Sequence, residues 1–335
     1  MPADNLPAPQ MQNLNYAEAV NAALHRAMAH LPDTILFGED VAKPGGVFGV
    51  TKNLRQQFAD RVFDTPISES AILGAAVGAA MLGRRPIVEI MWIDFSLVAL
   101  DQIVNQAANV RYVSAGRLQA PLTIRTQQGA LPGSCAQHSQ NLEALFAHIP
   151  GVLVGLPSTP QDAHDMLLSA IQADDPALII EHRGLYFGAK VEVRLDGPVL
   201  PVGGARVRRI GEHATIVSWG AMMHKVLDAA SVLEAEGVSA EVIDLRWLTP
   251  LDWPAVLASV AKTSRLLIVH EANVTGGFGA EIAARAADEA VYFLAGPVRR
   301  LGVPDSRIPA APHLQDALIP GVASIVAAVR SLLDS

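Results

Sequence analysis

Strand-like and helix-like segments alternate along almost the whole of this 335-residue chain. Short apolar runs such as "PIVEIM" and "TIVSWG" are each followed by a stretch with apolar residues at helical spacing. This alternation implies right-handed crossovers, which place consecutive strands parallel in a sheet covered by helices on both faces. The sequence therefore predicts an α/β fold of the doubly wound class.

The alternation is interrupted once, and the interruption divides the chain into two such units. Residues 186 to 212 are rich in Gly, Pro and Val and show no helical pattern, so we interpret them as a linker. One domain is then expected over residues 13 to 185 and another over residues 213 to 335, which fits the usual size of domains. Residues 1 to 12 are expected to form a disordered tail.

Composition excludes several classes of function. The formal net charge is -8 and there is no long run of Lys or Arg, which argues against binding to nucleic acid or to an anionic membrane surface. The single cysteine, Cys135, cannot form an internal disulfide. No membrane span is predicted, since Arg84 and Arg85 end the longest apolar run, and no signal peptide is recognisable. A cytoplasmic location is expected.

Four side chains that can carry chemistry follow predicted strands of the first domain. In open parallel sheets, ligands gather at the carboxyl ends of the strands. Those ends carry Glu39 in "GED", Glu69 in "ISES", Phe95 after "EIMWI", and a loop with His138. Each also has a structural interpretation. Glu39 could be a surface acid, and Glu69 could be an acid stabilised by the dipole of the helix that it begins. Phe95 could be a core ring, and His138 could be a structural histidine. The residues alone leave both interpretations open.

The predicted helix after Glu69, "AILGAAVGAAMLG", is made almost entirely of small apolar residues. Small residues recur at a spacing of four on adjoining faces of this helix, which lets another backbone approach closely: Gly74 and Gly78, Ala75 and Ala79, and Ala76 and Ala80. The partner could be this chain's own core or another subunit, and we favour a subunit interface. Ser68 or Ser70 is expected to cap this helix.

Glycine-rich loops give little support to a nucleotide site. "TGGFGAE" at 275 to 281 invites comparison with a phosphate loop, but it lacks the following Lys-Ser/Thr and is explained equally well by a turn that opens a helix. No GxGxxG follows a predicted strand, which argues against a nicotinamide-dependent dehydrogenase.

The order of several segments resembles a known family over residues 13 to 330. These segments include "GEDV", "RVFDTPISES", "DQIVNQAANVRY", "AQHSQNLEALFAHIPG" and "HEANVTGGFGAEIA". They resemble the beta subunit of thiamin-diphosphate-dependent 2-oxo acid dehydrogenases. The resemblance implies a pyrimidine-binding domain followed by a transketolase-type C-terminal domain. It also implies an alpha2-beta2 heterotetramer within a complex that contains a lipoyl acyltransferase and a flavoprotein dehydrogenase.

The same resemblance implies roles for the four strand-end residues. Glu69 matches the glutamate that hydrogen-bonds the aminopyrimidine ring of the cofactor and thereby promotes its activation. Phe95 matches an aromatic residue that packs on that ring, and Glu39 matches an acid close to the cofactor. His138 matches an active-site histidine that serves as a proton donor or as an oxyanion partner during acyl transfer to the lipoyl group, and the sequence leaves both roles open. A non-catalytic paralogue with the same fold would be expected to lose these residues.

The resemblance also implies two bound cations, Mg2+ and potassium. Thiamin enzymes hold Mg2+ and the diphosphate through a GDG motif, which this sequence lacks. Mg2+ and the diphosphate are therefore expected to be bound by an alpha subunit. A structural potassium ion is implied at the carbonyls of Leu122, Ala170 and Ile171 and at Asp175, although Ala173 departs from the acidic residue usual there.

The substrate implied by the resemblance is a 2-oxo acid, with pyruvate favoured. Acetoin is the alternative, followed by a branched-chain 2-oxo acid, because "TQQGALPGS" departs from the loop usual in all three enzymes. The C-terminal domain is expected to serve dimerisation and docking of the acyltransferase, with Asp305 as a candidate anion for the latter.

Overall fold

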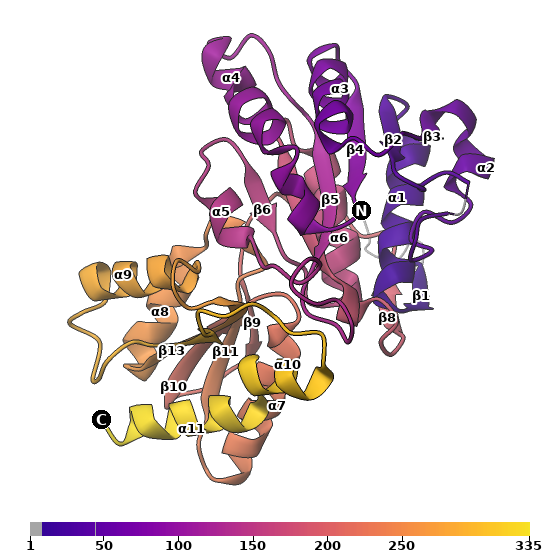
Figure 1. Ribbon diagram of the computed structural model, residues 1–335. Helices are drawn as coiled ribbons and strands as arrows, with labels where there is room; N and C mark the ends of the chain where they lie inside the picture. Colours follow the sequence, from indigo (N-terminus) through magenta and orange to yellow (C-terminus); the bar gives the residue numbers. More distant parts are fainter. Residues whose placement is uncertain (1–8, 44) are drawn as a thin grey trace, which may run out of the picture.

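The computed structural model describes residues 9–43 and 45–335, and it consists of two α/β units (Figure 1). The first unit contains β1 (Met11–Leu14), α1 (Tyr16–His30), β2 (Thr34–Gly38), α2 (Leu54–Phe58), β3 (Val62–Asp64), α3 (Glu69–Met81), β4 (Arg85–Ile90), α4 (Val110–Val113), β5 (Thr123–Gln128), α5 (Glu143–Ala147), β6 (Leu153–Gly155), α6 (Pro160–Gln172), β7 (Ala177–His182) and β8 (Val191–Arg194). The second contains β9 (Arg206–Arg209), β10 (Ala214–Ser218), α7 (Met222–Ala235), β11 (Ala240–Asp244), β12 (Trp247–Thr249), α8 (Trp253–Thr263), β13 (Leu266–Asn273), α9 (Gly279–Glu289), β14 (Arg299–Val303), α10 (Pro312–Leu318) and α11 (Val322–Leu333).

The large sheet has the strand order β12-β6-β7-β5-β4-β2-β3, and every pairing in it is parallel except that of β12. Successive side chains of a strand face opposite sides, so Leu36 and Ile87 pack under α1 and α6, whereas Phe37 and Val88 pack under α3. Helix α1 begins where the sequence predicts, because Asn15 and Glu18 form a capping box.

The second sheet has the order β14-β13-β10-β11-β9, and every pairing in it is parallel except that of β9 with β11. Ile216 and Leu267 face α7 and α11, while Val217 and Ile268 face the side covered by α8 and α9. Figure 1 shows these two helix pairs on opposite sides of the sheet. Both units are therefore doubly wound, as the alternation in the sequence predicts.

The two units share a strand and a core. The sequence predicts a single strand over "AEVIDLRWL", but β11 ends at Asp244 and β12 crosses to pair with β6 of the first unit. Arg246 stands between them with a positive φ of 61°, which turns the chain. One hydrophobic cluster accordingly runs from Phe37 of the first unit to Ile268 of the second.

The expected tail and linker both contain strands. Met11 and Gln12, expected in the tail, belong to β1, which pairs antiparallel with β8 of the expected linker. Strand β9, also in that linker, pairs antiparallel with β11. Strands β1 and β8 were missed because each is stabilised by a partner distant in sequence, whereas "RVRR" of β9 was interpreted as either a strand or part of the linker. The rest of the expected tail, residues 1 to 8, lies outside the described residues.

The helix predicted over residues 94 to 113 is broken. The chain there forms a 3-10 turn at Ile93–Leu97, a π-helical turn at Gln102–Gln106, another 3-10 turn at Ala107–Asn109 and then α4. The Asn105 side chain donates to Asp101, and the Asn109 side chain donates to the backbone carbonyl of Val104. Such local bonds compete with regular helix geometry.

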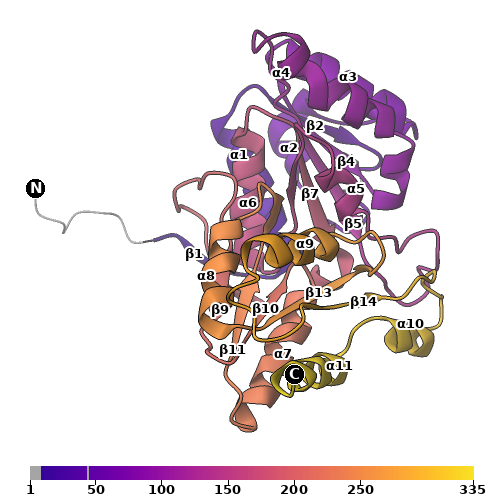
Figure 2. The same cartoon turned by 90° about the vertical axis from the view of Figure 1, so that its left-hand side faces the viewer.

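One described stretch, Pro312–Leu333, has the length and mean hydropathy (1.6) of a membrane span. The sequence predicts no membrane span here, because no apolar run is long enough, and predicts a closing helix over "PGVASIVAAVRSLL". In the structure it forms two separate helices, α10 and α11 (Figure 2). Ile325 and Val329 of α11 are buried against α7, so α11 is a core helix of the second unit.

Candidate functional site

The carboxyl ends of four neighbouring parallel strands place the predicted residues on one edge of the large sheet. Strands β3, β2, β4 and β5 are adjacent in that sheet. Glu39 directly follows β2, Glu69 begins α3 after β3, Phe95 lies in the turn after β4, and His138 lies in the loop after β5. This edge is where ligands bind in open α/β sheets.

Glu39 and Glu69 form a pair of interacting acids. Both side chains are partly buried, and within residues 9–43 and 45–335 no hydrogen bond or ion pair involves either carboxylate. Burial raises the pKa of Glu39, and the negative charges of Glu69 and Asp40 raise it further. The two carboxylates are therefore close enough to influence each other and are available to a ligand.

The expected cap of α3 differs from the structure. Ser68 is the N-cap residue, but its side chain accepts no capping hydrogen bond, and the Ser70 hydroxyl donates to the Val98 carbonyl at 2.6 Å. Glu69 therefore occupies the first turn of a helix whose amino end has no side-chain cap. The helix dipole favours a negative charge at this position.

Phe95 and His138 belong to one aromatic cluster with Trp92. The His138 ring lies edge-on to Phe95 at a centroid separation of 5.5 Å and edge-on to Trp92 at 5.1 Å. The Arg183 guanidinium lies 3.7 Å from the centroid of the Trp92 ring. Trp92 and Arg183 were missed by the sequence analysis, although both stand at strand ends, after β4 and β7.

Arg183 also fixes the loop that carries His138. Its Nη2 donates to the backbone carbonyl of His138 at 3.0 Å and to that of Gly129 at 3.3 Å. Burial lowers the pKa of Arg183, while the negative charge of Asp94 acts in the opposite direction. Asp94 in turn accepts from the Gln140 side chain at 2.9 Å. The cluster is thus held by contacts from three strand ends.

The small-residue face of α3 is not buried by the rest of the described chain. Ala75 and Gly78 are exposed, and Ala79 is only partly buried. This face lines an apolar pocket of about 320 Å3 together with the rings of Phe37 and Phe63, which stack at 5.0 Å. Ala76 and Ala80 on the adjoining face are buried in the chain's own core, so the core alternative holds for them, whereas Ala75 and Gly78 stay exposed and fit the subunit-interface alternative.

The glycines of "TGGFGAE" make room for a histidine. A Cβ on Gly277 would lie 2.7 Å from the His270 ring, and one on Gly279 would also lie 2.7 Å from it. His270 is buried and stacks on Trp219 at a centroid separation of 5.4 Å. The glycine pattern is thus explained by close packing and by the turn that opens α9, without a phosphate.

The groups expected to bind potassium already have hydrogen-bond partners. The carbonyls of Leu122 and Ala170 accept from backbone amides at 2.9 and 3.1 Å. Arg85 donates to the carbonyl of Ile171 at 3.1 Å, and Asp175 pairs with Arg111 at 2.5 Å. A guanidinium therefore lies where the cation is expected. These residues do not fit potassium unless Arg85 withdraws, and no chemistry below depends on that ion.

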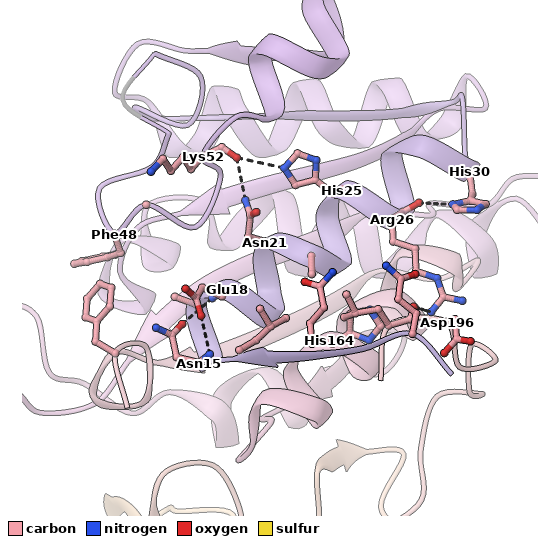
Figure 3. A pocket seen from close by; sticks show the side chains of 18 residues that line it. Asn15, Glu18, Asn21, His25, Arg26, His30, Phe48, Lys52, His164 and Asp196 are labelled. Carbon is pink, nitrogen blue, oxygen red and sulfur yellow. Dashed lines mark hydrogen bonds between the residues drawn. The ribbon is translucent and has the colours of Figure 1, made fainter. Parts of the chain in front are cut away.

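A large groove lies along α1, away from the predicted residues. Figure 3 shows this groove, of about 900 Å3, with Asn21 and His25 both hydrogen-bonded to the Lys52 carbonyl. Among the described residues, none of the four predicted side chains lines it. Size alone therefore does not identify the site here, and the strand-end residues carry the functional argument.

Within the part of the chain that the structure describes, no group of three or more His, Cys, Asp or Glu side chains is arranged to hold a metal ion. Asp305 is exposed and accepts from the Thr275 hydroxyl at 3.0 Å. It does not contact any of the four predicted site residues.

Two family models match this chain. The model of the transketolase pyrimidine binding domain matches residues 12–188, and that of the transketolase C-terminal domain matches residues 203–325. Among solved structures, a split-gene transketolase in an inactive beta4 tetramer is similar in fold, with a TM-score of 0.78 and 24% identity. That likeness covers 96% of this chain and 99% of the other.

Curated relatives are similar over nearly the full chain. The beta subunit of acetoin:2,6-dichlorophenolindophenol oxidoreductase from Cupriavidus necator is 42% identical over 96% of this chain and 98% of its own length. The beta subunit of 2-oxoisovalerate dehydrogenase from Bacillus subtilis is 39% identical over 97% of this chain and 100% of its own length. The beta subunit of the pyruvate dehydrogenase E1 component from Rhizobium meliloti is 42% identical over 96% of this chain and 70% of its own length.

Proposed function

Because this chain belongs to the family of beta subunits of thiamin-diphosphate-dependent 2-oxo acid and acetoin dehydrogenases, we propose that it is the beta subunit of a 2-oxo acid decarboxylating component. With its alpha subunit it oxidatively decarboxylates a 2-oxo acid, with pyruvate preferred, and passes the acyl group to a lipoyl acyltransferase. The observation that carries this proposal is the pair of interacting carboxylates, Glu39 and Glu69, which have no hydrogen-bond or ion-pair partner among the described residues and lie at the same sheet edge as the cluster of Phe95 and His138.

Glu69 is the group that shares a proton with the cofactor. Bound thiamin diphosphate supplies the nucleophilic carbon and the electron sink that decarboxylation requires. A carboxylate without an internal partner fits the aminopyrimidine, since it can hold a proton on a weakly basic ring nitrogen. Glu39, whose pKa is raised by burial and then by Glu69, keeps a second acid beside it and favours retention of a proton between the two.

Phe95 and His138 orient and complete the site. The Phe95 ring, partly buried against the core, offers a face on which the pyrimidine ring packs. His138 is held edge-on between Phe95 and Trp92, so that its imidazole is fixed in orientation. In that position it donates a proton during transfer of the acyl group to the lipoyl arm.

The alpha subunit supplies the rest of the site. It holds Mg2+ and the diphosphate, for which this sequence has no GDG motif. The exposed small-residue face of α3, with Gly78 at its centre, is the surface against which a neighbouring subunit of the alpha2-beta2 assembly packs. The assembly works in the cytoplasm, docked on the acyltransferase core.

Acetoin is the second candidate substrate. The specific observation in its favour is that the 42% identity to the acetoin oxidoreductase beta subunit of Cupriavidus necator extends over 98% of that relative, whereas the same identity to the pyruvate dehydrogenase beta subunit of Rhizobium meliloti extends over 70% of it. Turnover of pyruvate, acetoin and 3-methyl-2-oxobutanoate by the coexpressed subunits distinguishes the candidates, because only the correct substrate is expected to saturate the enzyme at low concentration.

Replacing Glu69 by glutamine tests the function directly. Glu69→Gln keeps the volume but cannot share a proton, so decarboxylation by the coexpressed subunits is expected to fall roughly 100-fold or more. Glu192→Gln is the matched control, because Glu192 is an exposed glutamate of β8 to which no role is assigned. Activity of Glu69→Gln within threefold of the wild type would contradict the assignment.

A further inference from the structure

The loop that carries His138 is held mainly by the second unit. The Gly133 amide donates to the carbonyl of Ala310 at 3.0 Å, and the Gln315 side chain donates to the carbonyl of Leu131 at 2.9 Å. Arg307 donates to the Gln140 side chain at 2.9 Å. Each of these anchors comes from the segment between β14 and α11. The position of His138 therefore depends on a domain that contributes no side chain to the predicted site.

Glu271 of β13 also contacts the His138 loop. Its Oε1 accepts from the Ala130 amide at 2.8 Å, and its Oε2 accepts from Nε2 of His182 at 2.9 Å. The Gly184 amide donates to Nδ1 of His182 at 3.1 Å, so the proton of a neutral ring lies on Nε2. One carboxylate thus ties the start of the His138 loop to the end of β7.

The same two segments are joined to His138 by one guanidinium. Arg183, adjacent to His182, donates to the carbonyls of both Gly129 and His138. The packing is close, because a Cβ on Gly129 would lie 1.9 Å from Nε2 of His182. Movement of His182 or of the Ala130 amide is therefore transmitted to the backbone of His138.

Glu271 can accept both of these hydrogen bonds only as an ionised carboxylate. Burial acts to raise the pKa of Glu271, but the hydrogen bonds that its carboxylate accepts from His182 and from the Ala130 amide outweigh burial and hold that pKa below its ordinary value. Both of its partners are donors. A glutamine can accept from one of them but presents its own N–H groups to the other.

We propose that Glu271 is a positioning residue for His138, through which the C-terminal domain controls acyl transfer. This inference rests on the proposed function, because it takes His138 to act in that step. Glu271 does not touch the pyrimidine side of the site, so the cofactor contacts of Glu39, Glu69 and Phe95 are independent of it.

The test compares Glu271→Gln with Glu241→Gln in the complex with the alpha subunit. Glu241 is the matched control, since it is also a buried carboxylate of the second sheet that accepts from a backbone amide, Gly211, and from a lysine, Lys262, but it does not contact the His138 loop. Three quantities are measured: cofactor affinity, reduction of an artificial electron acceptor, and acylation of a lipoyl domain.

Glu271→Gln is expected to slow acylation of the lipoyl domain roughly 10- to 100-fold, the effect of a small misplacement of a catalytic group. Cofactor affinity and acceptor reduction are expected to stay within threefold of the wild type. In the His138→Ala background, Glu271→Gln is expected to cause no further loss of acylation, because it acts through His138. Equal effects of Glu271→Gln and Glu241→Gln, or additive losses in the double variant, would overturn the proposal.

Hydrogen exchange separates this inference from the proposed function. Amides of residues 129 to 140 are expected to exchange faster in the assembled Glu271→Gln variant than in Glu241→Gln or the wild type. Unchanged exchange in this loop would overturn the positioning role whatever the substrate. Absence of turnover in the wild-type complex, with faster loop exchange in Glu271→Gln, would instead contradict the proposed function and leave the anchoring of the loop by Glu271 supported.

Discussion

Replacing Gly78 by leucine separates the folding of this chain from its assembly. Gly78 lies on the exposed face of α3, and a Cβ there meets no heavy atom within 4 Å. The isolated chain can therefore accept a larger side chain without strain. Because leucine favours a helix more than glycine does, the substitution is expected to stabilise the isolated chain by about 0.5–1 kcal/mol.

The effect on assembly is expected to have the opposite sign. If a neighbouring subunit packs closely on Gly74, Ala75, Gly78 and Ala79, the added side chain overpacks that contact. Overpacking of a close-packed surface costs about 1–3 kcal/mol, which corresponds to an affinity roughly 5- to 150-fold weaker. Sedimentation of the coexpressed subunits over a range of concentrations measures the loss, and thermal unfolding of the isolated chain measures its stability.

Ala327→Leu is the matched control, because Ala327 is an exposed small residue on another helix, α11. It is expected to leave assembly unchanged. The reasoning would be refuted if Gly78→Leu assembled with wild-type affinity, since the face would then lie outside the interface. It would also be refuted if Gly78→Leu destabilised the isolated chain, since the larger side chain would then clash with the chain itself.

His138, Gly279 and His270 each provide a further prediction. His138→Ala is expected to impair acylation of a lipoyl domain more than reduction of an artificial acceptor, and equal losses in the two assays would favour a general positioning role. Gly279→Ala is expected to lower the free energy of unfolding by about 1–3 kcal/mol, because its Cβ would lie 2.7 Å from the His270 ring; Gly321→Ala, with nothing within 4 Å, is the control in denaturant unfolding. Burial lowers the pKa of His270 from 6.5 to about 4, so between those pH values the unfolded chain binds a proton that the folded chain does not. His270 therefore has little effect on the free energy of unfolding above pH 6.5 and lowers it as the pH falls towards 4, by about 2 kcal/mol between pH 7 and pH 5. An unchanged pH dependence of unfolding in His270→Gln would contradict this prediction.

The fold was predictable because its elements are specified locally. The alternation of apolar strands with helical patterns predicts two doubly wound units, and the transketolase-type domain matches and the similar solved structure confirm that expectation. The start of α1 was predictable for the same reason, since Asn15 and Glu18 form their capping box within four residues.

Long-range pairing could not be predicted from local patterns. Strand β12 looks like a continuation of β11, and only its pairing with β6 of the other unit shows where it belongs. Strands β1 and β8 stabilise each other across the first unit, so neither has a strong signal alone. The broken helix after Phe95 depends on side-chain bonds from Asp101 and its neighbours.

The candidate site was predictable only in part. Glu39, Phe95 and His138 were identified because strand ends converge in a parallel sheet, and the structure places them at that edge. Trp92 and Arg183 share the same signal but were overlooked. The contact of Glu271 with the His138 loop depends on how the two units pack, which no spacing in the sequence reveals.

Binding of thiamin diphosphate tests the central claim most directly. Calorimetric titration with the cofactor and Mg2+ is carried out on the isolated chain and on the chain coexpressed with its alpha subunit. Because the proposed half-site offers Glu39, Glu69 and Phe95 to the pyrimidine and the sequence has no GDG motif for the diphosphate, the isolated chain is expected to show no micromolar binding and no decarboxylase activity. The coexpressed pair is expected to show both. Micromolar binding by the isolated chain would contradict the half-site that we propose, since it would show that the chain holds a complete cofactor site by itself.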